Sequence, residues 1–217
     1  MKNKIFMILM CAALVLTTAC SNNGDPSGGS SVSSDESETG SFAHGEQDGN
    51  TYTSEFFGIK AELPEGWTLQ SEEELAQTNG ISDMSDENAD KALNKSGVLY
   101  EMFALTETSA NVNIAVENLN ITNGGKTLSA EEYIDLSIGN LEKQYKAAGI
   151  AEVTVEKSTV DFLGSEKPCI SVKLENEGQE LFQKMVPLTN GIYIGAVTFT
   201  GASEEEISTE TEMFSSL

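Results

Sequence analysis

The sequence predicts an α+β fold, in which helices pack on an antiparallel β-sheet to give an α/β/α sandwich. Three observations carry this prediction: turns too short for crossover connections, capping signatures that open helices, and one long amphipathic helix. The C-terminal half reads as four alternating strands joined by tight, glycine-containing turns. These strands are expected at residues 151–162, 169–174, 181–186 and 192–200.

Four further strands are expected in the N-terminal half of the domain. Residues 52–58 and 59–63 have short strand patterns that end at a turn. Residues 98–105 are apolar on both alternating faces, which is typical of a central strand covered on both sides. Residues 111–117 follow closely, so we expect an antiparallel hairpin between these two strands.

Capping boxes, in which a Ser and a Glu three residues later bond each other's backbone, open three of the four expected helices. They begin at Ser71, Ser129 and Ser203, and a helix without such a box is expected at residues 85–95. The helix that follows Ser129 is the longest and should end at Gly149. Its apolar face is expected to consist of Ile134, Ile138, Leu141, Tyr145 and Ala148. The closing helix is expected to pack against the domain through Ile207, Phe214 and Leu217.

Residues 1–19 read as a secretion signal, because two lysines precede an apolar run too short for a mature transmembrane helix. The end of this run, Leu16-Thr17-Thr18-Ala19-Cys20, resembles the lipobox of bacterial lipoproteins. The resemblance implies that Cys20 becomes the N-terminus and carries a diacylglyceryl anchor with palmitate-type chains. We therefore expect a lipoprotein anchored on the extracytoplasmic face of the bacterial cell membrane. The alternative is an ordinary secretory signal that leaves a free thiol at Cys20.

Residues 20–50 are expected to form a disordered, acidic tether, and residues 51–217 the globular domain. The tether is rich in Ser, Gly, Asp and Glu, with Val32 and Phe42 almost its only large apolar residues, so it cannot form a core. His44, the one histidine of the chain, is expected at the surface of this tether.

The chain has 12 lysines and no arginine against 35 acidic residues, a net charge of −23. This balance argues against nucleic acid and against docking on anionic lipid, since both need a basic surface. Membrane contact is therefore expected through the N-terminal lipid, and the expected partners are a basic protein or a small ligand. High negative charge also favours a soluble monomer.

No catalytic, metal-binding or cofactor-binding residue is predicted. The domain from residue 51 onward has no histidine, which removes triads and histidine–zinc sites. Cys169, its one cysteine, lies in a strand and is expected to be buried and inert. The densest acidic cluster lacks the residue order of a calcium loop; it consists of Asp83, Asp86, Glu87 and Asp90. We interpret it as negative charge that stabilises the N-terminal end of a helix through the helix dipole.

Four short segments carry a family resemblance: Phe57-Gly58-Ile59, Leu63-Pro64-Glu65-Gly66-Trp67, Glu132-Tyr133-Ile134 and Gln183-Lys184. They are similar to segments of bacterial lipoproteins of the PsbP-like, Mog1-like group, and the similarity extends over residues 51–217. The resemblance implies an antiparallel sheet between helices and a role as an accessory or binding module. It transfers no functional residue to this sequence.

The function expected from these observations is that of a lipid-anchored extracytoplasmic binding or accessory protein. One alternative is an envelope hydrolase that uses a pair of carboxylates, since acidic residues are abundant. Another is a small solute-binding component of a transporter, which is disfavoured because such proteins need two lobes and this chain has length for one.

Overall fold

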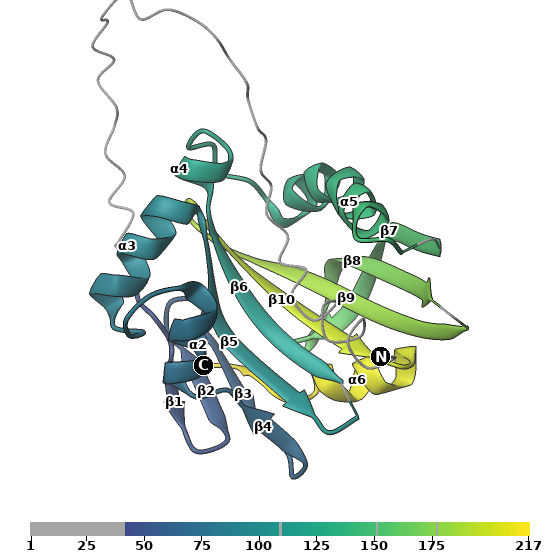
Figure 1. Cartoon of the computed structure of the whole chain (residues 1–217), viewed down its shortest axis with the longest axis horizontal. Coiled ribbons are helices and arrows are strands. Elements are labelled where there is room, and N and C mark those ends of the chain that lie inside the picture. Colours follow the sequence, from purple (N-terminus) through teal and green to yellow (C-terminus); the bar gives the residue numbers. More distant parts are fainter. Residues whose placement is uncertain (1–41, 109, 151, 177) are drawn as a thin grey trace, which may run out of the picture.

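The computed structural model describes residues 42–217 apart from residues 109, 151 and 177, and this part of the chain forms two β-sheets and five helices (Figure 1). The large sheet contains β4 (Trp67–Leu69), β5 (Val98–Thr106), β6 (Asn111–Asn118), β7 (Glu152–Phe162), β8 (Ser165–Asn176), β9 (Gln179–Asn190) and β10 (Tyr193–Gly201). The small sheet contains β1 (Glu46–Asp48), β2 (Thr51–Ser54), β3 (Ile59–Glu62) and β11 (Phe214–Ser216). The helices are α2 (Glu72–Asn79), α3 (Asp86–Ser96), α4 (Leu119–Thr122), α5 (Ala130–Ala147) and α6 (Glu204–Thr211).

The large sheet has the strand order β4-β5-β6-β10-β9-β8-β7, and every neighbouring pair is antiparallel. The predicted α+β fold with an antiparallel sheet and packed helices is therefore confirmed. Tight turns between β7, β8, β9 and β10 join strands that are adjacent in the sheet, as their length requires.

One face of the large sheet packs against α5, which lies across β7, β8 and β9 (Figure 1). Leu141 and Tyr145 of α5 are buried against apolar side chains that alternate along β8, such as Ile170 and Val172. The predicted apolar face of this helix is correct at Ile134, Leu141 and Tyr145, with Ile138 partly buried. Ala148 is exposed, because the helix ends beside it and the chain turns away at Gly149.

The opposite face of the large sheet is covered by the small sheet together with α6. Phe199 of β10, Phe162 of β7 and Phe214 of β11 meet here, with ring centroids 5.4–5.6 Å apart. Ile207 of α6 is buried in the same core. The sequence predicted helices on this face, whereas strands β2, β3 and β11 pack here beside α6.

The edge of β5 beyond β4 is closed by a side chain of α2. Asn79 Oδ1 accepts a hydrogen bond from Tyr100 N at 2.7 Å, and Asn79 Nδ2 donates one to Tyr100 O at 2.8 Å. The amide thus replaces a neighbouring strand at this position, which protects an otherwise exposed edge. This contact explains why α2 lies beside β5 (Figure 1).

The capping signatures predicted the helix starts correctly. Ser71 and Ser129 each form the full reciprocal box with Glu74 and Glu132. At α6, Ser203 Oγ accepts from Glu206 N at 3.1 Å, but the Glu206 carboxylate accepts from Ala202 N. That helix ends at Thr211, so Phe214 packs from a strand, and Leu217 is 61% exposed where a buried position was expected.

Residues 42–50 belong to the folded domain, although the sequence analysis placed them in the tether. Phe42 is 1% exposed, and β1 pairs with β2. The segment is polar on average, so its composition concealed one buried aromatic residue and the strand that follows it. Residues 1–41, including the predicted signal and Cys20, lie outside the described residues.

Gly195 of β10 lies directly under an aromatic ring, which gives a test of the core. A Cβ atom at this position would lie 2.9 Å from Phe57 Cζ. The variant Gly195→Ala is expected to lose about 1–3 kcal/mol of unfolding free energy through overpacking, measured by urea denaturation. The matched variant Gly139→Ala, on the exposed face of α5 with no atom within 4 Å of its Cβ, should gain about 0.5–1 kcal/mol. Equal effects of the two substitutions would contradict this packing.

Candidate functional site

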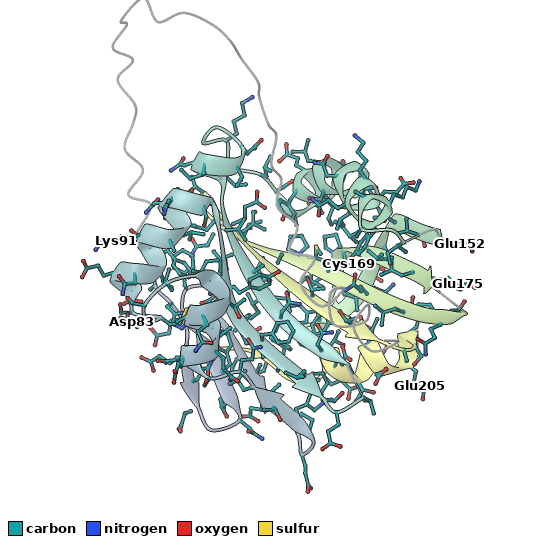
Figure 2. The ribbon with its side chains drawn as sticks, in the orientation of Figure 1. Asp83, Lys91, Glu152, Cys169, Glu175 and Glu205 are labelled. Carbon is teal, nitrogen blue, oxygen red and sulfur yellow. The ribbon has the colours of Figure 1, made fainter. Side chains whose placement is uncertain are left out.

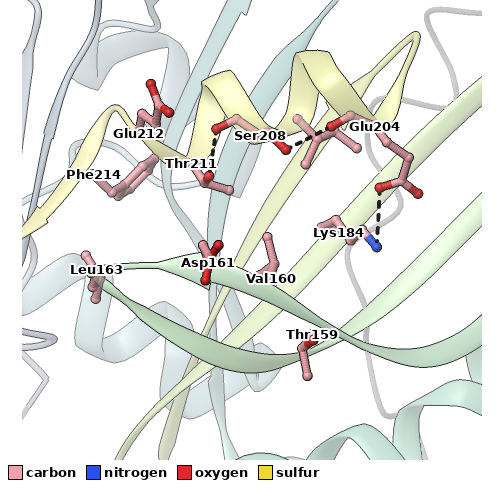
Figure 3. Close-up of a pocket in the computed structure, with 12 residues that line it drawn as sticks. Thr159, Val160, Asp161, Leu163, Lys184, Glu204, Ser208, Thr211, Glu212 and Phe214 are labelled. Carbon is pink, nitrogen blue, oxygen red and sulfur yellow. Dashed lines mark hydrogen bonds and ion pairs between the residues drawn. The ribbon is translucent and has the colours of Figure 1, made fainter.

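A cleft between β7 and α6 is the candidate functional site of the described domain (Figure 3). Its volume is about 470 Å³. One wall is the C-terminal end of β7 with the turn that follows it, and the other wall is α6; Lys184 enters from β9. We call this space the β7–α6 cleft.

The floor of the β7–α6 cleft is apolar. Ile207 and Phe214 are buried in the core between the two sheets, and Val160 packs against that core. Leu163 also lines the cleft from the β7–β8 turn, where it has a φ of 54° followed by Gly164 with a φ of 72°. Positive φ at both central positions is the geometry of a type I′ hairpin turn, and leucine rarely adopts it. The turn therefore holds a strained apolar residue at the cleft wall.

Lys184 is the cation of the cleft and is only 8% exposed. Its ammonium group lies 3.3 Å from Glu204 Oε2 and donates a hydrogen bond of 3.3 Å to Ser158 Oγ. A buried ammonium group needs such partners. The charge of Lys184 is thus largely satisfied by groups of the protein itself.

Cys169 lies close to Lys184 and Ser158, inside the body of the domain (Figure 2). Its side chain is fully buried, as the sequence predicted. Burial raises the pKa of the Cys169 thiol to about 11, although the positive charge of Lys184 acts in the opposite direction. Because the thiolate is the reactive form, this thiol is poorly suited to nucleophilic chemistry near neutral pH.

The rim of the β7–α6 cleft is rich in hydrogen-bond acceptors. Asp161 and Glu212 are exposed carboxylates on opposite walls. Ser208 Oγ donates to Glu204 O at 3.2 Å and Thr211 Oγ1 donates to Ser208 O at 2.8 Å, so both hydroxyl protons are already used within α6. These groups present lone pairs to the cleft, which suits a ligand that donates hydrogen bonds.

Three carboxyl groups are buried elsewhere in the domain. Glu101 is fully buried in the β-bulge of β5, Glu117 lies on β6, and Glu210 lies on α6. Burial raises the pKa of Glu101 to about 7 and that of Glu210 to about 9, and it also raises the pKa of Glu117. Perturbed carboxyls of this kind are candidates for acid–base catalysis.

These buried carboxyls do not form a catalytic pair in the part of the chain that the structure describes. Glu101 accepts from Gly45 and Ser54 on the side of the small sheet, whereas Glu117 accepts from Tyr133 Oη of α5 at 2.9 Å on the other side. Glu210 is on neither of these strands, and none of the three lines the β7–α6 cleft. A glycosidase needs two carboxyls facing one substrate, and these three buried groups do not supply such a pair.

His44 is held in the domain, in contrast to the expected position on a tether. Its backbone N donates to Asp86 Oδ1 at 2.9 Å, and both ring nitrogens are buried without a hydrogen-bond partner among the described residues. Burial lowers the pKa of His44, while the carboxylates of Glu72 and Asp86 act in the opposite direction. His44 is therefore a packed, neutral imidazole near pH 7.

The acidic cluster from Asp83 to Asp90 performs the helix-start role expected for it. Asp83 Oδ1 accepts from Ser85 N at 3.1 Å and from Asn88 Nδ2 at 2.8 Å, at the beginning of α3. Hydrogen bonds from Ser85 and Asn88 lower the pKa of Asp83 to about 2. Among the described residues, no group of three or more His, Cys, Asp or Glu side chains is arranged to hold a metal ion.

Sequence reasoning did not find the β7–α6 cleft, because its walls come from segments far apart in the chain. The one available signal was Lys184, a lysine that directly precedes the apolar run Met185-Val186-Pro187-Leu188. The predicted lipidation site, Cys20, is outside the described residues, so its lipidation remains a prediction. Within residues 42–217, apart from the three undescribed positions, no helix is both long and apolar enough to cross a membrane.

Comparison with known proteins identified no relative: no protein-family model matches this chain, and no curated protein sequence is significantly similar to it.

Glu210 offers a pH test of the buried carboxyls. Burial and the neighbouring carboxylate of Glu206 raise its pKa from 4.5 to about 9, although the backbone of Thr200 acts in the opposite direction. The wild-type domain should therefore lose stability as the pH rises from about 4.5 towards 9, because ionisation is disfavoured in the folded state. In the variant Glu210→Gln this loss is absent, so its unfolding free energy relative to wild type should increase between pH 5 and pH 8. Parallel pH profiles would contradict the prediction, and Glu205→Gln, on the exposed side of α6, serves as the control.

Proposed function

We propose that the protein is a lipid-anchored extracytoplasmic binding protein, whose β7–α6 cleft holds a small ligand with an ammonium or similar cationic group and an apolar body. The observation that carries the proposal is the polarity of the cleft. Its cation, Lys184, is satisfied by Glu204 and Ser158, whereas Asp161 and Glu212 have no ion-pair partner among the described residues.

The apolar floor of the cleft supports the proposal that the ligand has an apolar body. Val160, Leu163, Ile207 and Phe214 give the ligand body a surface that excludes water. The strained turn at Leu163 supports a functional role, since strained residues concentrate at ligand sites. The resemblance to PsbP-like, Mog1-like lipoproteins agrees with a binding role at the envelope.

The same rim chemistry fits the predicted basic protein partner, if a lysine or arginine side chain enters the cleft. The volume of about 470 Å³ is within the usual range for a small-molecule site, which favours the free ligand. No described side chain of the cleft provides the histidine or thiolate of a nucleophilic enzyme, so binding without turnover is the simplest function for this set of residues.

The anchor is tested by the variant Cys20→Ser in the intact precursor. The wild-type protein should fractionate with membranes and carry the acyl mass, whereas the variant should be released into the soluble fraction, because the sulfur that accepts the lipid is missing. Immunoblotting of the two fractions measures the outcome. A variant that stays with the membrane at high salt would contradict lipid anchoring.

The ligand class is tested by calorimetric titration with hexylammonium, hexanol and hexanoate, which share one apolar body. Hexylammonium is expected to bind most tightly and hexanoate least. Asp161→Asn and Glu212→Gln should each weaken hexylammonium binding by up to about fivefold, since exposed ion pairs contribute roughly 0.2–1 kcal/mol. Increasing salt should weaken it further.

The matched control is Glu152→Gln, an exposed carboxylate at the far end of β7 (Figure 2). It changes the net charge as much as the cleft variants but should leave hexylammonium binding unchanged. Equal binding of the three probes, or equal effects of the control and cleft variants, would contradict the proposed site.

A further inference from the structure

Residues 42–48 lie over the domain and are attached to it at four places. Phe42 packs its ring against Phe56 and Tyr193, at centroid distances of 5.2 and 6.0 Å. His44 N donates to Asp86, as described above, and β1 pairs with β2. The fourth attachment is a hydrogen bond of 2.9 Å from Gly45 N to Glu101 Oε1. We call residues 42–48 the strap.

The attachment to Glu101 is unusual because the acceptor is a fully buried carboxyl group. Glu101 is the extra residue of the β5 bulge, which turns its side chain toward β2 and the strap. Oε1 also accepts from Ser54 Oγ at 3.4 Å, whereas Oε2 has no hydrogen-bond partner among the described residues. The hydroxyl of Tyr52 neighbours the same carboxyl group, outside ordinary hydrogen-bond geometry.

Gly45 fits this position because it has no side chain. A Cβ atom at Gly45 would lie 2.4 Å from Tyr52 Oη, so a larger residue would separate the strap from β2. The absence of a side chain at Gly45 therefore allows the strap to approach Tyr52 and Glu101 closely. Because Gly45 N bonds to Glu101 Oε1, releasing the strap would remove one of the groups that enclose this carboxyl.

We propose that residues 42–48 are a pH-sensitive strap, held closed while the buried carboxyl group of Glu101 is protonated and loosened when that group loses its proton. No lysine forms an ion pair with Glu101 in the described structure, so no positive charge offsets its ionised form. Burial raises the pKa of Glu101 to about 7, although the neighbouring Tyr52 hydroxyl and the hydrogen bonds from Gly45 and Ser54 act in the opposite direction. Opening the strap returns this group toward its ordinary pKa of 4.5.

The direction of the pH effect follows from these values. The closed strap is most stable below pH 4.5 with respect to Glu101, and it loses stability as the pH rises through about 7. The other titratable groups facing the strap are His44, Glu72 and Asp86, together with Tyr52 and Tyr193, whose pKa values are raised above 10. Burial lowers the pKa of His44, so His44 acts in the opposite sense and disfavours the closed strap as the pH falls below 6.5.

The consequence of release is a longer connection between the domain and the chain that precedes it. Seven residues span at most about 25 Å when extended, which adds to the reach of the domain from its N-terminal attachment. This consequence for reach rests on the proposed lipid anchor, whereas the strap itself does not depend on the proposed ligand or on the anchor. A test of the strap can therefore fail or succeed independently of the proposed ligand and of the proposed anchor.

The experiment is hydrogen–deuterium exchange of the full chain between pH 5.5 and pH 7.5, with protection factors corrected for the intrinsic pH dependence of exchange. The protection of peptides covering residues 42–50 is expected to fall by about tenfold across this range, while that of α5 stays constant. In Glu101→Gln, which keeps an acceptor for Gly45 N, the fall should vanish or reverse because His44 alone remains. An unchanged protection factor in the wild type, or the same fall in Glu101→Gln, would overturn the proposal.

Two further variants keep the test decisive if Glu101→Gln folds poorly. His44→Gln leaves Glu101 in place and removes the opposing group, so protection of the strap should fall more steeply with pH than in the wild type. Glu117→Gln removes another buried carboxyl, on the side of α5, and should leave the strap profile identical to that of the wild type. A shallower fall in His44→Gln, or a lost pH dependence in Glu117→Gln, would assign the effect to the whole domain and overturn the strap.

Discussion

The burial of β10 on both faces is the constraint on which the rest of the structure depends. Val197 and Phe199 pack toward the small sheet, whereas Ala196 packs toward α5. β10 leads directly into α6 and then into β11, which pairs with β3. Packing of this one strand therefore fixes the position of α6 over β7 and the attachment of the small sheet. The cleft is a consequence of the core, and β7 and α6 supply rigid parts of its walls, which suits a site that must hold its shape.

The carboxylates of the cleft lie in a different environment from most of the acidic residues of the chain. With 12 lysines against 35 acidic residues, most carboxylates have no lysine to pair with. Most labelled acidic side chains therefore lie at the periphery, where water solvates them (Figure 2). In the cleft the one lysine is already bonded to Glu204 and Ser158, and the remaining carboxylates stand above an apolar floor. This arrangement of charge is the basis of the proposed preference for a ligand of opposite charge.

The sequence predicted the parts of the fold that local patterns determine. Alternation predicted the strands from β5 to β10, and a Ser with a following Glu predicted where α2, α5 and α6 begin. Contacts between distant residues were not predictable in this way. The strap reaches Glu101 across 56 positions, and Phe214 joins the core from a strand that pairs with β3. Composition assigned residues 42–50 to a tether because it averages over a window, whereas buried Phe42, two hydrogen bonds and the pairing of β1 with β2 decide the fold there.

The buried carboxyl at Glu101 shows why pH dependence, and not stability alone, is the property to consider at the strap. A buried carboxyl with one unpartnered oxygen is costly compared with a neutral side chain of similar size. The strap needs a single acceptor for Gly45 N, and a glutamine amide would supply it without any ionisation. The carboxyl adds nothing further to that hydrogen bond in its protonated form. What it adds is a closed state whose stability changes near neutral pH, at the point where the folded domain meets the chain that precedes it.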